Sequence, residues 1–188
     1  ISATVLSRYF STSEVVGIIE ANDVLDQKDG DEAASGKITL AVSEVNDVAG
    51  NGKLTLKVDV SNEMVGKEVT VFVKNMGKTT ESIVGNVIPT ENNNEISTMD
   101  SFKKSDDADD WMKDNGMKIA NDAILVYNGV YDGTASIDDL YGSSYGMAGM
   151  ERRLLDNDGD NKADIIFLVE KVLVQVDKID TKNETITL

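Results

Sequence analysis

The chain has 188 residues, with 34 acidic and 18 basic side chains, a formal net charge of −16 at pH 7 and an apolar content of 40%. This apolar content is typical of a folded globular protein, whereas the negative charge disfavours nucleic acid and anionic membrane surfaces as partners. The chain has no cysteine and no histidine, which excludes disulfides, thiol nucleophiles, Ser-His-Asp triads and the usual zinc sites.

Alternating apolar residues predict β-strands throughout the first half of the chain. In the segments 36–45 and 52–60, every second residue is apolar over most of the length, which predicts two strands that each bury one face. Asn51-Gly52 lies between them and favours a tight turn because both residues tolerate positive φ, so we expect a β-hairpin. Three more segments have strand-like sequences: 14–21, 67–75 and 81–88. Five short strands with Gly- and Asn-rich turns predict a small twisted β-barrel or sandwich.

A change of pattern follows the only proline, Pro89. The segment 90–97 after it is polar, and we interpret it as a joint between two subdomains, 1–90 and 91–188. One continuous domain is the alternative. No apolar run reaches the roughly 20 residues that a membrane-spanning helix needs, so no membrane span is expected.

The second half predicts two short helices between further strands. In the segment 105–116, Ser105 can cap a helix that starts with acidic residues at the positive end of its dipole. Ser136 and Asp139 have capping-box spacing, which predicts a second helix. Strands are expected in the segments 122–131, 163–180 and 181–188. The predicted fold class is mainly β (α+β): a barrel or sandwich, then a second β-rich subdomain with two short helices.

The two ends of the chain share a short sequence pattern. The segments 14–23 and 36–40 near the start resemble the segments 172–183 and 184–188 at the end. Chance is one explanation, because the match is short and consists of residues common in strands. The other explanation is that the chain stops partway into another copy of its opening motif, as in a modular array. The chain begins at Ile1, with neither an initiator Met nor a signal peptide, so we interpret it as an excised fragment or a mature form.

The stretch LLDNDGDNKADIIFLVEK, residues 154–171, carries the strongest candidate site. Counted from Asp156 as position 1, acidic side chains stand at positions 1, 3, 5 and 9, and Lys162 at position 7 can add its carbonyl oxygen. Calcium takes about 6–8 oxygen ligands in flexible geometry, whereas zinc prefers nitrogen or sulfur and magnesium demands stricter octahedral geometry. We therefore predict a calcium site formed by Asp156, Asp158, Asp160, Lys162 and Asp164.

This loop departs from an EF-hand in three places. Its glycine, Gly159, stands at position 4, Asn161 stands at position 6, and Phe167 replaces the bidentate glutamate at position 12. Asn161 can adopt the left-handed conformation that position 6 demands. The alternative to a metal site is a β-turn in which the aspartates accept backbone N–H groups as Asx turns, with no ion bound.

Other candidate sites are weaker. The acidic run 106–110 is better explained as a helix start than as a cation patch. Four tyrosines, Tyr127, Tyr131, Tyr141 and Tyr145, allow a sugar-stacking platform, although core or interface roles suit them better. The glycine-rich segment 141–150 lacks the context of a phosphate-binding loop. A carboxylate pair can hydrolyse glycosides, but with 34 acidic residues any pair can be selected afterwards, so we expect no enzyme activity.

The order of motifs in the second half resembles a known family. A YNG strand (127–129), the aspartate loop and a V-x-x-V-D-type strand resemble ectodomains found beside S-layer homology repeats in Clostridium-like and Paenibacillus-like bacteria. The segments 7–22 and 66–75 also resemble matching parts of that family. The residues that match the family loop, DxDGDGKAD, are Asp156, Asp158, Gly159, Asp160, Lys162, Ala163 and Asp164. Asn161 replaces the second glycine of the family loop.

This resemblance implies a non-catalytic module of a bacterial S-layer or cell-envelope protein, located on the cell surface. It implies attachment to a cell-wall polymer through repeats that lie outside this chain, with neighbouring modules of the same protein as partners and self-association as a further partnership. A calcium-dependent carbohydrate or cell-wall binding module is the second hypothesis. An accessory domain of an exported polysaccharide hydrolase is the third.

Overall fold

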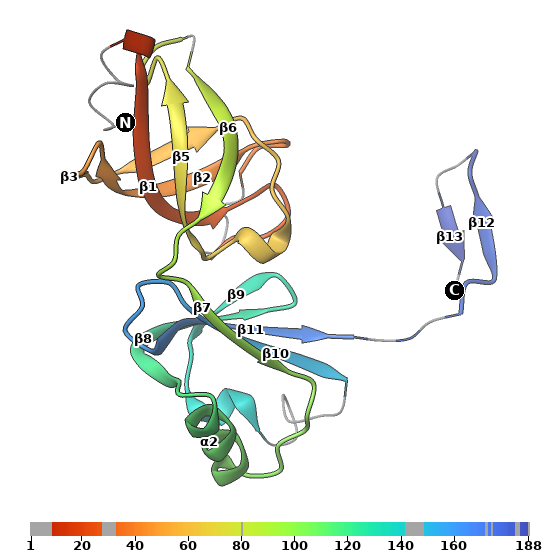
Figure 1. The fold of residues 1–188 in the computed structure, drawn as a ribbon. Coiled ribbons are helices and arrows are strands. Elements are labelled where there is room, and N and C mark those ends of the chain that lie inside the picture. Colours follow the sequence, from red (N-terminus) through yellow and green to blue (C-terminus); the bar gives the residue numbers. More distant parts are fainter. Residues whose placement is uncertain are drawn as a thin grey trace.

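The computed structural model describes residues 9–27, 33–79, 81–141, 149–171, 173, 175–182 and 185–187 (Figure 1). Within these ranges the fold is mainly β, as the sequence predicts, with two large sheets, a small C-terminal sheet and the α-helix α2 (Ser105–Asp114). None of the described helices is long and apolar enough to cross a membrane.

The first sheet contains the strands expected from the alternating segments. They are β1 (Thr12–Ala21), β2 (Ile38–Val45), β3 (Val48–Ala49), β4 (Lys53–Leu56), β5 (Glu68–Lys74) and β6 (Ser82–Pro89). The order is β3-β2-β1-β5-β6, with β4 also paired to β2. The described pairings leave this sheet open, so the arrangement is like a sandwich rather than a closed barrel. A short 3₁₀ helix, η1 (Asn62–Met64), precedes β5.

The predicted hairpin is confirmed, but its tight turn lies elsewhere. β2 pairs with β4 in antiparallel fashion, with Leu40 opposite Leu54. The two-residue turn is Asn46-Asp47, with φ values of 50° and 63°, and it joins β2 to β3. Positive φ at both central residues suits a type I′ hairpin turn, so Asn46-Asp47 serves the role predicted for Asn51-Gly52.

The second sheet combines antiparallel and parallel pairs. Its strands are β7 (Asn94–Thr98), β8 (Lys118–Tyr127), β9 (Val130–Thr134), β10 (Met150–Asp156) and β11 (Lys162–Glu170), in the order β7-β10-β11-β8-β9. β11 is the central strand, antiparallel to β10 and parallel to β8. Two short strands, β12 (Lys178–Asp180) and β13 (Thr185–Thr187), form the small C-terminal sheet.

Two helical elements cover one face of the second sheet. The helix α2 (Ser105–Asp114) buries Ala108 and Met112 against a core that includes Ile166. Its N-cap residue is Lys104, without a side-chain cap, so Ser105 is the first helical residue rather than the predicted cap. The second predicted helix is a 3₁₀ helix, η2 (Ile137–Leu140), with the expected capping box.

The other face of the second sheet packs against the first sheet. Leu155, Ile165 and Phe167 are at most 2% exposed and share one hydrophobic cluster with Val71 of β5. The connection between the sheets is also fixed by Asn93, whose side chain exchanges two 2.8 Å hydrogen bonds with the backbone of Glu68. The division into subdomains at residue 90 remains a prediction.

Candidate metal centre

The aspartate loop is the turn of the β10–β11 hairpin, and Asp156 organises it. Asp156 is the last residue of β10 and is fully buried. Its Oδ1 accepts hydrogen bonds from the backbone nitrogens of Asp158 (3.1 Å) and Gly159 (2.7 Å), and its Oδ2 accepts one from Asn161 (2.8 Å). These are the Asx-type bonds that the alternative interpretation predicts. The three hydrogen bonds to the carboxylate of Asp156 therefore account for the turn.

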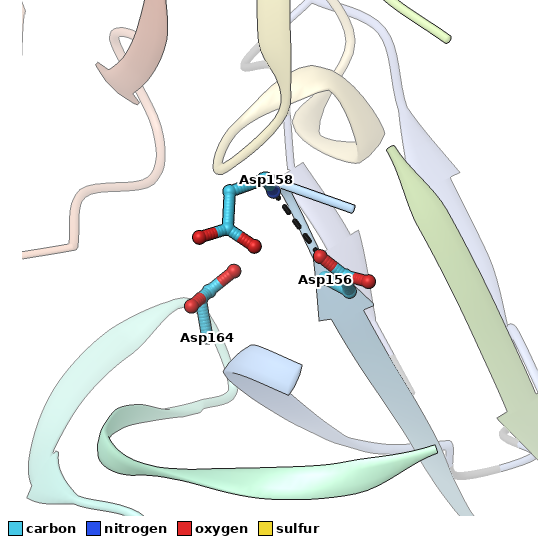
Figure 2. Close-up of side chains that lie close together, drawn as sticks. All are labelled: Asp156, Asp158 and Asp164. Carbon is cyan, nitrogen blue, oxygen red and sulfur yellow. Dashed lines mark hydrogen bonds between the residues drawn. The ribbon is translucent and has the colours of Figure 1, made fainter. Parts of the chain in front are cut away.

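Three of the predicted ligands come together. One carboxylate oxygen each from Asp156, Asp158 and Asp164 lie within 4.8 Å of one another. Figure 2 shows the carboxylates of Asp158 and Asp164 facing each other, with Asp156 beside them at the end of its strand. Asp156 is buried, Asp164 is half-buried and Asp158 is exposed, so water can reach the group from one side. We call Asp156, Asp158 and Asp164 the acidic triad.

The fourth aspartate of the pattern points to a different partner. Asp160 forms an ion pair with the side chain of Lys162 and accepts a 2.8 Å hydrogen bond from its backbone nitrogen. The side-chain hydrogen bond from Lys162 holds the pKa of Asp160 below its ordinary value. Ligation of an ion by Asp160 or by the carbonyl of Lys162 remains a prediction.

Burial and nearby negative charges act together on Asp164. Burial raises the pKa of this carboxyl, and the negative charges of Asp158, Asp156 and Asp160 raise it further. A 2.9 Å hydrogen bond from the backbone nitrogen of Asn157 acts in the opposite direction. A cation at the triad would offset both the repulsion and the cost of burial, because an opposite charge nearby favours the ionised carboxylate.

The donor set fits a hard cation. An ionised carboxylate offers about four positions that can accept a hydrogen bond or bind a cation. Three backbone N–H groups donate hydrogen bonds to the carboxylate of Asp156 in this structure. Asp156 therefore has room for about one contact to an ion, whereas Asp158 and Asp164 have more. Oxygen ligands that are completed by water suit calcium, which accepts flexible geometry.

The left-handed residues of the loop support the turn rather than the ion. Asn161 has a φ of 64° and Gly159 a φ of 81°. The expectation that Asn161 adopts the left-handed conformation is confirmed. The replacement of the second glycine by asparagine is therefore compatible with this backbone.

The loop also contacts the first sheet, which the sequence did not indicate. Asn157 is 8% exposed, and its Nδ2 donates a 3.0 Å hydrogen bond to the carbonyl oxygen of Gly66. On the other side, a Cβ added to Gly159 would lie 3.5 Å from the backbone oxygen of Asn92. Neither Asn157 nor Gly66 fits a ligand pattern, and 91 positions separate them. The candidate site thus lies where the two sheets meet.

The weaker candidate sites have ordinary structural roles where the structure describes them. In the acidic run, Asp109 pairs with Lys113 and Asp107 caps the backbone nitrogen of Lys103 at 3.2 Å. Among the tyrosines, the hydroxyl of Tyr127 lies 3.2 Å from Glu170, and that of Tyr141 donates to Asp138 at 2.8 Å. Tyr127 and Tyr141 also pack against the second core. The segment 142–148, with Tyr145, lies outside the described residues.

Comparisons with protein-family models, with curated proteins and with solved structures found no match. Function is therefore inferred from the sequence and geometry of this chain.

Proposed function

We propose that this chain is a non-catalytic structural module of a bacterial surface layer, stabilised by a calcium ion at the acidic triad. The observation that carries the proposal is the position of the triad, whose three carboxylates lie within 4.8 Å of one another at the junction of the two sheets. An ion there would hold the end of β10 and the start of β11 together. Through the bond from Asn157 to Gly66, it would also steady the first sheet.

The expected affinity suits an exported protein. Calcium sites of extracellular modules have dissociation constants of about 10⁻⁴–10⁻³ M, matched to the calcium concentration outside cells. The triad has one exposed carboxylate, and part of Asp156 is committed to the backbone. Both features favour weak binding of this order. The resemblance to ectodomains beside S-layer homology repeats supports the location on the cell surface, with wall attachment by domains outside this chain.

The calcium proposal is tested by thermal unfolding in millimolar calcium and in a chelator. A ligand that binds only the folded state stabilises it by about 0.4–1.4 kcal/mol at a concentration roughly 1 to 10 times its dissociation constant, which is the range that millimolar calcium gives here. We expect calcium to raise the melting temperature, and we expect D158N and D164N to remove the increase. The matched control is D106N, because Asp106 is an exposed aspartate on α2 outside the loop.

Further variants and ligands sharpen this test. D160N shows whether the fourth carboxylate takes part: a retained calcium effect restricts the site to the triad, and a lost effect adds Asp160 to it. Melting curves that are the same in calcium and in chelator would reject the ion. Binding of purified cell-wall glycan would favour the recognition module instead, and turnover of a polysaccharide would favour the hydrolase accessory domain.

A further inference from the structure

Three asparagines of the chain are followed directly by glycine: Asn51, Asn115 and Asn128. Asparagine is a thermolabile residue, and a following glycine has no Cβ to keep its backbone nitrogen away from the asparagine side chain. An Asn-Gly pair is therefore prone to lose its side-chain amide without any enzyme. All three asparagines are exposed, so neither the local sequence nor exposure to water distinguishes them.

Hydrogen bonds hold the side chains of two of these asparagines. Nδ2 of Asn115 donates a 2.8 Å hydrogen bond to the carbonyl oxygen of Trp111, and the backbone nitrogen of Gly116 donates a 3.0 Å bond at the same helix end. Oδ1 of Asn128 accepts a 2.8 Å bond from the backbone nitrogen of Glu170. Loss of the amide requires the asparagine side chain to turn towards the following nitrogen, so these bonds oppose it.

Asn51 lies in the connection from β3 to β4 and has no such restraint. Within the described ranges, neither its side chain nor the peptide group that joins it to Gly52 takes part in a hydrogen bond. The chain is fixed on both sides of this peptide group. The backbone nitrogen of Gly50 donates to the carbonyl oxygen of Ser43 at 2.7 Å, and the carbonyl oxygen of Gly52 accepts from the backbone nitrogen of Val42 at 2.9 Å.

We propose that Asn51 is a site of spontaneous deamidation, and that the fold directs this modification to Asn51 rather than to Asn115 or Asn128. The backbone nitrogen of Gly52 loses its proton and attacks Cγ of Asn51, which forms a C–N bond and a cyclic succinimide. The Cγ–Nδ2 bond breaks, and the amide nitrogen takes up a proton and leaves as ammonia. Water then opens the ring at either carbonyl, which gives aspartate or isoaspartate.

The isoaspartate product would disturb the first sheet. Its main chain runs through the former side chain, which adds a methylene group between the two fixed points. Next to it lie the bond from Val42 to Gly52 and the pair of Lys53 with Ala41, which joins β4 to β2. The aspartate product keeps the normal main chain and adds only a negative charge. We therefore expect isoaspartate, and not aspartate, to loosen β4.

Peptide mapping by mass spectrometry tests the site on the whole 188-residue chain. The chain is incubated folded and, in parallel, unfolded in urea, where each Asn-Gly pair reacts at the rate set by its local sequence. Relative to that rate, folding should slow deamidation of Asn115 and Asn128 several-fold more than that of Asn51. The product should thus accumulate first at residue 51, and it should be absent there in N51A. Equal protection of all three asparagines, or a first product at Asn115 or Asn128, would overturn the inference.

Hydrogen exchange tests the structural consequence. In the isoaspartate fraction, purified from the aged chain, the backbone amide of Val42 should exchange several-fold faster than in the unmodified chain. N51D is the matched control, because it carries the same added charge on a normal main chain, and its Val42 amide should remain protected. Equal protection in both forms would contradict the loosening of β4. Calcium and chelator should give the same order of reaction at the three asparagines, so failure of the calcium proposal is recognised separately.

Discussion

The side-chain nitrogen of Asn157 donates a buried 3.0 Å hydrogen bond to the carbonyl oxygen of Gly66. Asn157 follows the last residue of β10, and Gly66 stands two positions before β5 in the other sheet. The bond therefore connects the candidate metal loop directly with the first sheet. Stability of the loop and packing of the sheets are expected to change together.

Replacing Asn157 by alanine should destabilise the fold. The carbonyl oxygen of Gly66 would lose its side-chain donor inside the junction, and an unsatisfied buried polar group costs about 1–3 kcal/mol. Urea denaturation measures this change in the free energy of unfolding. The control is N115A, because Asn115 is exposed and bonds only the end of its own helix, at Trp111. Equal effects of N157A and N115A would show that the junction does not depend on this bond.

Gly66 itself has no room for a side chain. It has a φ of 92°, and an added Cβ would lie 2.6 Å from Cδ1 of Ile165 and 3.0 Å from Cδ2 of Leu155. Overpacking a core costs about 1–3 kcal/mol, so we expect G66A to lower the melting temperature clearly. Gly52 has a φ of 104° with nothing within 4 Å of such a Cβ. G52A therefore measures backbone strain alone, and a loss no greater in G66A than in G52A would contradict tight packing of the junction.

The pH dependence of stability should report the crowding at Asp164. Burial raises the pKa of Asp164 above its ordinary value of 3.8, so the folded state binds this proton more readily than the unfolded chain. The contribution of Asp164 to stability then falls as pH rises from 3.8 through the folded-state pKa. In chelator, D164N should gain stability relative to the unchanged chain across that window. In calcium at neutral pH, D164N should instead be the less stable of the two.

Asp160 provides a control of opposite sign. The pKa of Asp160 lies below its ordinary value of 3.8 because of its hydrogen bond with Lys162. Its contribution to stability is therefore present above pH 3.8 and is lost as pH falls through the lower folded-state pKa. D160N should show no gain over the unchanged chain as pH rises. The same pH trend in D160N and D164N, from unfolding curves in chelator, would contradict a specific effect at Asp164.

Local structure in this chain follows from local sequence. Alternation in the segment 67–75 predicts β5, and the spacing of Ser136 and Asp139 predicts the capping box of η2, which forms with a 2.7 Å bond from the backbone nitrogen of Ser136. The turn that Asp156 organises is likewise encoded within six residues. Such features depend on neighbours a few positions away, which a sequence displays directly.

Features that depend on distant neighbours were not predicted. Arg152 is fully buried and donates hydrogen bonds to the carbonyl oxygens of Leu140 and Asp100 at 3.0 and 2.7 Å. Its position next to Arg153 in the sequence gives no indication of this burial. The sequence also does not indicate the parallel pairing of β8 with β11, because strand periodicity does not specify a partner strand. Within the candidate site, Asp160 forms an ion pair with Lys162. This contact depends on side-chain directions that the regular spacing of the aspartates does not indicate.

The central position of β11 has a mechanical consequence. Its first residue, Lys162, follows the aspartate loop directly, and its last, Glu170, leads towards the C-terminal hairpin. Antiparallel β10 and parallel β8 hold it on its two sides. Tension on the hairpin along the strand would therefore load both rows of backbone hydrogen bonds in shear, so that many must break at once. An ion at the acidic triad would fasten the far end of this strand against that load.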